Sequence, residues 1–220
     1  VCKILYLCSR KASAMTEFEM IAKTFQGLEE ILAKELIDLG ANGVAIGNRM
    51  VSFKGDKALM YKANFHLRTA IRILKPFLHF KADSADDVYE ICRKVDWEKY
   101  MDLSDSFAVD SVVYSEDFRH SKFVAYRVKD AIADYFRDKY GKRPNVSVAN
   151  PDLTFHIHIS HDDCSLSLDS SGESLHKRGY RAIGNDAPLH ETLAAGMIQL
   201  TRFRGREYFW DPFCGSGTIP

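Results

Sequence analysis

Apolar residues recur in the first part of the chain at the spacings of a small unit of strands and helices. Residues 18–24 have strand character, and residues 27–39 carry Leu and Ile at three- and four-residue steps, which predicts an amphipathic helix. Two short apolar runs flank Gly47-Asn48-Arg49, a sequence typical of a hairpin turn. A second, short helix is expected over residues 57–64. This order of elements predicts an α+β unit within residues 15–65.

A longer series of elements is expected between residues 66 and 169. They are a strand within 68–81 that is broken near Pro76, a helix over 86–95 with Ser84 as N-cap, a strand over 106–114, a helix over 121–140, and strands over 145–148, 153–159 and 164–169. Trp97 and Tyr100 are expected to cover the core of this region. The last two strands are expected to form an antiparallel hairpin.

His156 and His158 share one face of the strand expected over residues 153–159, because side chains alternate between the two faces of a strand. Two histidines on one face could bind a metal ion, but the neighbouring residues offer only Asp162 and Asp163 as further ligands. A solvent-facing strand surface is the favoured interpretation, and no metal site is expected.

The end of the sequence combines an aromatic run with a glycine-rich turn. Glu207-Tyr208-Phe209-Trp210 predicts a buried strand, which ends in Asp211-Pro212-Phe213-Cys214-Gly215-Ser216-Gly217-Thr218. The two glycines allow a sharp turn and the close approach of a ligand, and Thr218 is expected to open a helix. No Lys follows the second glycine, which excludes a phosphate-binding P-loop, and Pro220 disfavours a dinucleotide loop. A plain turn remains the alternative.

The composition limits the class of protein. The 220 residues are 46% hydrophobic and 27% charged, which suits one or two globular domains. The formal net charge is zero, so any nucleic-acid site would depend on a local cluster of cations. Five scattered cysteines lack the spacing of zinc ligands and indicate a reducing compartment, which points to the cytoplasm. No apolar run approaches the roughly 18 residues that span a membrane.

Residues 1–14 contain a short apolar core and an Ala12-Ser13-Ala14 that imitates a signal-peptidase site. The core is shorter than the ~7–15 residues of a signal peptide, and Arg10-Lys11 interrupts the segment. We expect residues 1–14 to be an appendage that is disordered or translated from upstream of Met15.

Cations lie beside the apolar stripe of the helix expected over residues 121–140. Lys122, Arg127 and Lys129 are among them, interspersed with aspartates, and Lys142-Arg143 follows the helix. A face of mixed sign is usually a solvated face, and the pattern alone favours that interpretation.

Residues 170–186 have no periodicity and are rich in Gly, Ser and cations, which predicts a linker. Lys177, Arg178 and Arg181 within it could hold phosphate, or they could pack and pair at a domain interface. A helix is expected over residues 189–201, after Pro188.

Three blocks of the sequence resemble one family. Residues 211–218 resemble motif I, the S-adenosylmethionine loop, of RNA guanine-N2 methyltransferases that carry a THUMP domain. Residues 169–181 (DSSGESLHKRGYR) and 187–195 (APLHETLAA) are similar to the same family, in order and at the same spacing. The resemblance implies an α+β protein with a ferredoxin-like unit (15–65), a THUMP domain (66–169), a linker (170–186) and the truncated start of a Rossmann-like α/β methyltransferase domain (187–220).

The resemblance also implies ligands. It implies S-adenosylmethionine as cofactor, bound by Asp211, Pro212, Phe213, Cys214, Gly215, Ser216, Gly217 and Thr218, with Glu191 and Thr192 as neighbours. It implies structured RNA, ribosomal RNA in particular, as partner, contacted by Lys122, Arg127, Lys129, Lys142, Arg143, Lys177, Arg178 and Arg181. The motifs that hold the ribose and the target amine in relatives are absent from this sequence, so no catalytic residue is expected in it.

The expected function is therefore the RNA-binding N-terminal portion of a methyltransferase that acts on guanine N2 in large-subunit ribosomal RNA. These 220 residues alone are expected to be inactive. Two alternatives stay open: a stand-alone THUMP protein that binds RNA without catalysis, and part of a DNA adenine-N6 methyltransferase.

Overall fold

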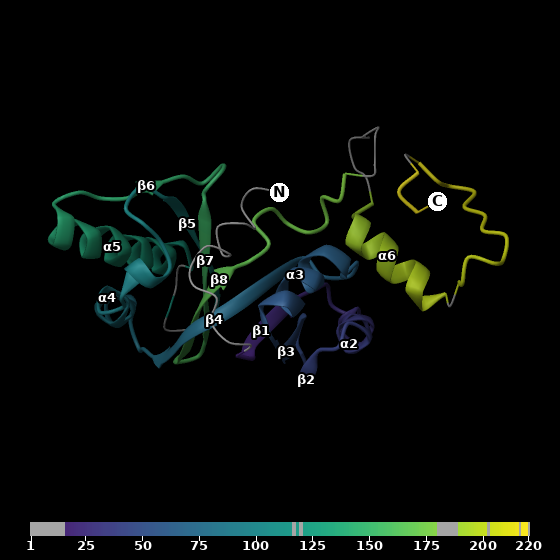
Figure 1. Ribbon diagram of the computed structural model, residues 1–220, viewed down its shortest axis with the longest axis horizontal. Coiled ribbons are helices and arrows are strands. Elements are labelled where there is room, and N and C mark those ends of the chain that lie inside the picture. Colours follow the sequence, from purple (N-terminus) through teal and green to yellow (C-terminus); the bar gives the residue numbers. More distant parts are fainter. Residues whose placement is uncertain are drawn as a thin grey trace. The chain divides into compact units, whose positions relative to one another are not determined.

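The computed structural model describes residues 16–115, 118, 121–179, 189–201, 203–215 and 217–219. These residues form two compact units (Figure 1). The first unit takes in the chain up to Leu74 together with the residues from Glu173 onward, and the second unit is Lys75–Gly172. The segment expected to be an appendage, 1–14, lies outside the described residues, as do Arg181 and Ser216.

The first unit is an antiparallel sheet with helices, in the strand order β2-β3-β1-β4. Its elements are β1 (Phe18–Lys23), α2 (Glu29–Asp38), β2 (Asn42–Gly47), β3 (Met50–Gly55), α3 (Lys57–His66), the start of β4 (Arg72–Lys81) and α6 (Glu191–Leu200). The strand, helix, hairpin and helix expected from the sequence are therefore confirmed. Gly40, at φ 88°, follows α2 in a left-handed conformation that suits a residue without a Cβ.

The core of the first unit lies between this sheet and α2 and α3. Met20 and Ala22 point inward from β1, and Val51 and Phe53 point inward from β3, all with 0% exposure. These inward side chains alternate along each strand, and they pack in one core with the buried residues of α2, which recur at three- and four-residue steps. Asp56 begins α3, because its carboxylate accepts a hydrogen bond from the Leu59 N–H at 2.7 Å.

The second unit has the strand order β4-β8-β7-β5-β6, in which β5 runs parallel to β7 and to β6. Its further elements are α4 (Ala85–Arg93), a 3-10 turn (Trp97–Lys99), β5 (Ser106–Tyr114), α5 (Ser121–Tyr140), β6 (Asn145–Val146), β7 (Leu153–Ser160) and β8 (Asp163–Asp169). Ser84 caps α4 and β7 pairs with β8 as a hairpin, as the sequence predicts.

Aromatic residues fill the core of the second unit. Trp97 is fully buried, and its ring lies 5.2 Å from that of Phe155, between centroids, and 6.2 Å from that of Phe77. The Trp97 Nε1–H donates to the Cys92 carbonyl at 2.8 Å, which satisfies its polar atom inside the core. The prediction that Trp97 covers the core is confirmed.

Pro76 does not break the strand in which it lies, contrary to the sequence prediction. β4 is continuous from Arg72 to Lys81. Its pairing with β1 covers only Arg72 to Leu74, so Pro76 lies beyond the point where β1 would need an N–H from β4. On the side of β1, the donor that a proline lacks is therefore not required.

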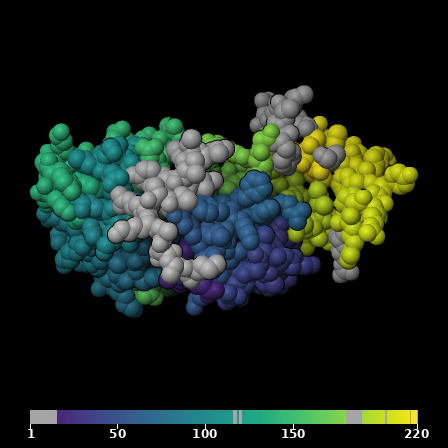
Figure 2. All heavy atoms as spheres, in the orientation of Figure 1, coloured from purple at the N-terminus to yellow at the C-terminus, as the bar shows by residue number. Residues whose placement is uncertain are grey.

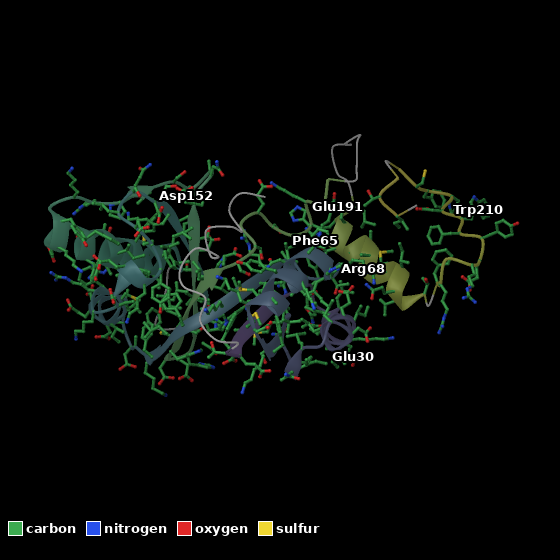
Figure 3. All side chains as sticks on the ribbon, viewed as in Figure 1. Glu30, Phe65, Arg68, Asp152, Glu191 and Trp210 are labelled. Atoms are coloured by element: carbon green, nitrogen blue, oxygen red, sulfur yellow. The ribbon has the colours of Figure 1, made fainter. Side chains whose placement is uncertain are left out.

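The prediction of a buried strand over residues 207–210 is also wrong. No strand is found there in the described part of the chain, and Tyr208, Trp210 and Phe213 are 107%, 86% and 91% exposed. The segment carries the yellow end of the colour scale in Figure 2, and Trp210 is labelled in Figure 3. A strand needs a neighbour to receive its backbone hydrogen bonds, and none pairs with this segment. Thr218 likewise opens no helix among these residues.

The prediction that His156 lies on a solvent-facing strand surface is wrong. The His156 side chain is 13% exposed, and its Nε2 lies 3.4 Å from Asp169 Oδ2 and 3.7 Å from Asp110 Oδ2. β7 lies between β5 and β8, so the side chains of both neighbours flank it. Within the described ranges, no group of three or more His, Cys, Asp or Glu residues could hold a metal ion. No helix there is both long and apolar enough to cross a membrane.

Candidate functional site

Ion pairs and hydrogen bonds join one flank of α5 to α4 and to the turn that follows α4. Arg127 Nη2 lies 2.5 Å from Asp86 Oδ1, and its guanidinium lies 4.2 Å from the centroid of the Tyr89 ring. Further along, Arg93 Nη2 reaches Asp138 at 2.5 Å. The Arg127 side chain, which is 25% exposed, is thus held against α4 by these two contacts.

Asp134 collects several donors on the same flank. It accepts a hydrogen bond from the Tyr89 hydroxyl at 2.9 Å and from Arg143 Nη2 at 3.2 Å, and Arg137 Nη2 lies 3.0 Å away. Near the end of α5, Lys139 Nζ donates to Glu98 at 2.8 Å, and this hydrogen bond raises the pKa of Lys139. Arg143 is therefore tied to the helix that precedes it, although its side chain stays 55% exposed.

Of the remaining predicted cations of the second unit, Lys122 and Lys142 face solvent, whereas the Lys129 side chain is 34% exposed. No ion pair is found for Lys122 or Lys142 among the described residues. Lys129 Nζ lies 3.5 Å from Asp130 Oδ1 and 5.1 Å from the centroid of the Tyr126 ring. Cations with exposed ammonium groups can attract phosphates through long-range and salt-dependent forces.

The Arg178 side chain caps the C-terminal end of α3 in the first unit. Its guanidinium donates to the carbonyls of Asn64 and Phe65, both at 3.2 Å, and to the carbonyl of Leu67. These are carbonyls at a helix end, which lack partners within the helix. Burial lowers the pKa of the Arg178 guanidinium. The packing alternative for Arg178 is thus the one that its contacts support, whereas Lys177 pairs loosely with Glu173 at 3.7 Å and is 60% exposed.

The predicted cofactor loop turns through its two glycines. Gly215 has φ 54° and Gly217 has φ 72°, and the Gly217 N–H donates to the Cys214 carbonyl at 2.8 Å. One carboxylate oxygen of Asp211 accepts from the Phe213 N–H at 3.0 Å, which orders the entry to the turn. A Cβ built on Gly217 would meet no atom within 4 Å, so this side of the backbone is open to a ligand.

α6 packs against α2 through a close approach that the sequence signals only by a glycine inside a helix. A Cβ added at Gly196 would lie 2.5 Å from Leu28 Cδ2, so the buried Leu28 side chain would have to shift to admit one. Gln199 Nε2 donates to Glu35 Oε1 at 3.0 Å. At the start of the helix, Glu191 and Thr192 are buried, at 7% and 1% exposure.

Glu35 is the centre of a polar cluster that the sequence analysis missed. Besides Gln199, it accepts from the Thr69 hydroxyl at 2.6 Å, from the Thr69 N–H at 3.1 Å and from Arg68 Nε at 3.2 Å. Arg68 is labelled in Figure 3. These partners are distant from Glu35 in sequence, and a lone Glu on a helix carries no local signal of such a role.

Two histidines stack beside the start of α6. The rings of His176 and His190 have centroids 4.1 Å apart, and Phe25 lies edge-on to His190 at 4.8 Å. His176 Nδ1 lies 2.7 Å from Ser174 Oγ. Burial lowers the pKa of His190, and the neighbouring His176 lowers it further.

Comparison with known proteins gives three consecutive matches to domain families. Residues 19–74 match the RlmL ferredoxin-like domain, residues 82–169 match the THUMP domain, and residues 178–220 match the RMKL-like methyltransferase domain. The chain thus carries, in this order, the domains found in THUMP-containing methyltransferases. Its fold is accordingly a ferredoxin-like unit and a THUMP domain, followed by residues of a methyltransferase domain.

Individual relatives of this chain are also described as methyltransferases or methylases. It is 40% identical over 199 residues to the ribosomal RNA large subunit methyltransferase K/L of Syntrophotalea carbinolica, covering 88% of this chain and 28% of that protein. A crystal structure from Listeria monocytogenes, described as a predicted N6-adenine-specific DNA methylase, superimposes with a TM-score of 0.80 at 34% identity, covering 98% of this chain and 55% of that one.

A second solved structure shows a ligand. SMU.472, crystallised in complex with SAH, has a TM-score of 0.78 at 29% identity, covering 92% of this chain and 54% of that chain. The chain spans between 28% and 54% of the length of three curated relatives that it matches.

Proposed function

We propose that this chain is the RNA-binding N-terminal portion of an S-adenosylmethionine-dependent methyltransferase that modifies guanine N2 in large-subunit ribosomal RNA. The observation that carries the proposal is the order of the matched domains, in which THUMP residues 82–169 precede methyltransferase residues 178–220. The name of the Syntrophotalea relative supports ribosomal RNA as the substrate. The free, buried cysteines Cys92 and Cys164 support a cytoplasmic location.

The residues of the cofactor loop suit S-adenosylmethionine. The backbone at Gly215 and Gly217 would approach the methionine and ribose parts of the donor, since neither carries a Cβ. Asp211 has a second carboxylate oxygen, which would accept from the ammonium group of the donor. When bound, the donor supplies an electrophilic methyl group on a sulfonium.

The contribution of this chain to the reaction is recognition and placement of RNA. Lys122, Lys142 and Arg143 would attract phosphates, and this attraction is set by local charge because the chain has no net charge. None of the described residues is assigned to proton transfer or to the target amine. The 220-residue chain is thus proposed to bind RNA without turning it over.

Salt-dependent binding tests the proposal. The protein is titrated with a fluorescent hairpin of large-subunit ribosomal RNA at several salt concentrations, with Lys122→Glu, Lys142→Glu and Arg143→Glu as variants. Each phosphate contact contributes about 0.7–0.9 to the slope of log K against log salt, so each reversal should weaken binding and flatten the slope by about that amount.

Lys34→Glu on α2 is the matched control, because Lys34 is an exposed lysine outside the second unit. Its binding curve and slope should equal those of the wild type. An unchanged slope in all three variants of the second unit would place the RNA surface elsewhere, and no RNA binding by the wild-type chain would refute the proposed function.

The description of the Listeria structure favours one second candidate, a methyltransferase that acts on DNA adenine. A competition assay separates the two. If duplex DNA displaces the RNA hairpin at equal or lower concentration, the DNA candidate replaces the RNA proposal.

A further inference from the structure

α5 has a second flank that differs from the flank tied to α4. Phe123 and Tyr126 are 53% and 54% exposed on this side of the helix, although both are large aromatic residues. Lys122 and Lys129 lie beside them. We call Lys122, Phe123, Tyr126 and Lys129 the outer face of α5. Exposed aromatic residues that gather on one surface are typical of a binding site.

The spacing of these four residues makes them neighbours. Lys122, Tyr126 and Lys129 stand at steps of four and three residues, and Phe123 stands three residues before Tyr126, so all lie on one side of the helix. The ammonium of Lys129 lies 5.1 Å from the centroid of the Tyr126 ring, at the distance of a cation–π contact.

The charge of this face is positive at its N-terminal part. No acidic residue lies in the first turn of α5, so the charge of Lys122 is not offset within that turn. Asp130, one turn beyond Tyr126, marks the acidic end of the face and lies 3.5 Å from Lys129. On the adjoining flank, by contrast, Arg127 is already paired with the carboxylate of Asp86 on α4.

Resting on the proposed function, we propose that the outer face of α5 binds an unpaired RNA segment, with nucleobases stacked on Phe123 and Tyr126 and phosphates held by Lys122 and Lys129. Aromatic rings stack on bases of any sequence because every base has a π-face, and adjacent cations follow the backbone. Paired bases already stack on one another inside a helix, so this face selects unpaired nucleotides. The THUMP domain thereby reads RNA by strand state as well as by charge.

The test compares two labelled RNAs of equal length, an unpaired oligonucleotide and a blunt hairpin, in titrations of the 220-residue chain. Phe123→Ala and Tyr126→Ala should each weaken binding of the unpaired RNA by about five-fold or more. The salt slope should stay unchanged, because no charge is removed. Lys122→Ala should instead lower the slope by about 0.7, the value for one contact to single-stranded RNA.

Two variants serve as controls. Tyr126→Phe keeps the ring and should bind like the wild type. Tyr140→Ala removes a tyrosine of the same helix with a similar exposure, 50%, from outside the outer face, and should also bind like the wild type. Circular dichroism of each variant confirms that it is folded.

Three results would overturn the inference. Wild-type affinity of the folded Phe123→Ala and Tyr126→Ala variants would show that RNA does not touch these rings. An equal loss for the unpaired RNA and the hairpin would remove base stacking as the reason. A wild-type chain that is dimeric and becomes monomeric on Tyr126→Ala would show that a second copy occupies the face. Failure of the wild type to bind any RNA would instead refute the proposed function itself.

Discussion

Substitution of Glu35 by Ala gives the sharpest test of how the first unit is held together. Glu35 is 9% exposed and receives hydrogen bonds from the turn at Arg68 and Thr69 and from Gln199 on α6. Thr69 is fully buried, and its own carbonyl accepts from the Thr24 hydroxyl at 2.7 Å. The carboxylate thus joins α2, the turn before β4 and α6.

The magnitude follows from the donors that lose their acceptor. Glu35→Ala leaves the N–H and the hydroxyl of Thr69 buried and unpaired, at a cost of about 1–3 kcal/mol each. The exposed Arg68 side chain, 69% accessible, regains water and contributes little. A loss of about 3–5 kcal/mol in unfolding free energy is expected once the deleted side chain is included.

Urea unfolding followed by circular dichroism measures the loss, and amide hydrogen exchange of the peptide that contains Thr69 locates it. Thr69→Val is the matched variant, because it removes one donor and leaves the carboxylate with its other partners; it should cost about 1–2 kcal/mol. A Glu35→Ala protein within ~0.5 kcal/mol of the wild type, with unchanged exchange at Thr69, would refute the argument that this carboxylate organises the turn.

Two further predictions concern α6. Gly196→Ala should destabilise the chain by about 1–3 kcal/mol, because the new Cβ would lie 2.5 Å from Leu28 Cδ2, whereas the same change at an open helix position is stabilising. Thermal melting shows the sign of the change. In a chain that already carries Leu28→Ala, the cost of Gly196→Ala should be smaller. Burial lowers the pKa of His190, so the unfolded chain binds a proton that the folded chain resists. Stability should therefore fall as the pH drops below about 6.5, the pKa of an unperturbed His, and the fall should cease below the folded-state pKa. His190→Gln should flatten this dependence in thermal melts taken between pH 7 and pH 5; an identical pH dependence would rule His190 out as its source.

The sequence was a good guide wherever a segment is stabilised by its own neighbours. α5 begins at Ser121 and ends at Tyr140, as its apolar stripe predicts, because one face of the helix must be buried. β5 matches its predicted bounds for the same reason, with alternation replacing the helical period. The left-handed backbone at Gly215 and Gly217 was also predictable, since this conformation strongly favours glycine.

The failures occur where a distant segment decides the outcome. Pro76 looks like a strand breaker from its own chemistry, yet β4 continues through it, and the pairing of β4 with β1 ends before Pro76, at Leu74. His156 looks exposed in an alternating strand, yet Asp110 and Asp169 come beside it from neighbouring strands. Residues 207–210 have the composition of a buried strand, but composition does not supply the partner that a strand requires.

The contacts of α6 bear on how the cofactor loop is held. α6 lies within the residues that match the methyltransferase domain, yet Gly196 packs against Leu28 and Gln199 bonds to Glu35, both of the ferredoxin-like unit. A helix with a glycine at a tight contact and a partly buried hydrogen bond has one preferred position, since sliding along α2 would break both contacts. The ferredoxin-like unit therefore fixes the helix from which the chain leads to Asp211. In this chain, the ferredoxin-like unit thereby helps to position the residues that we propose to bind the methyl donor.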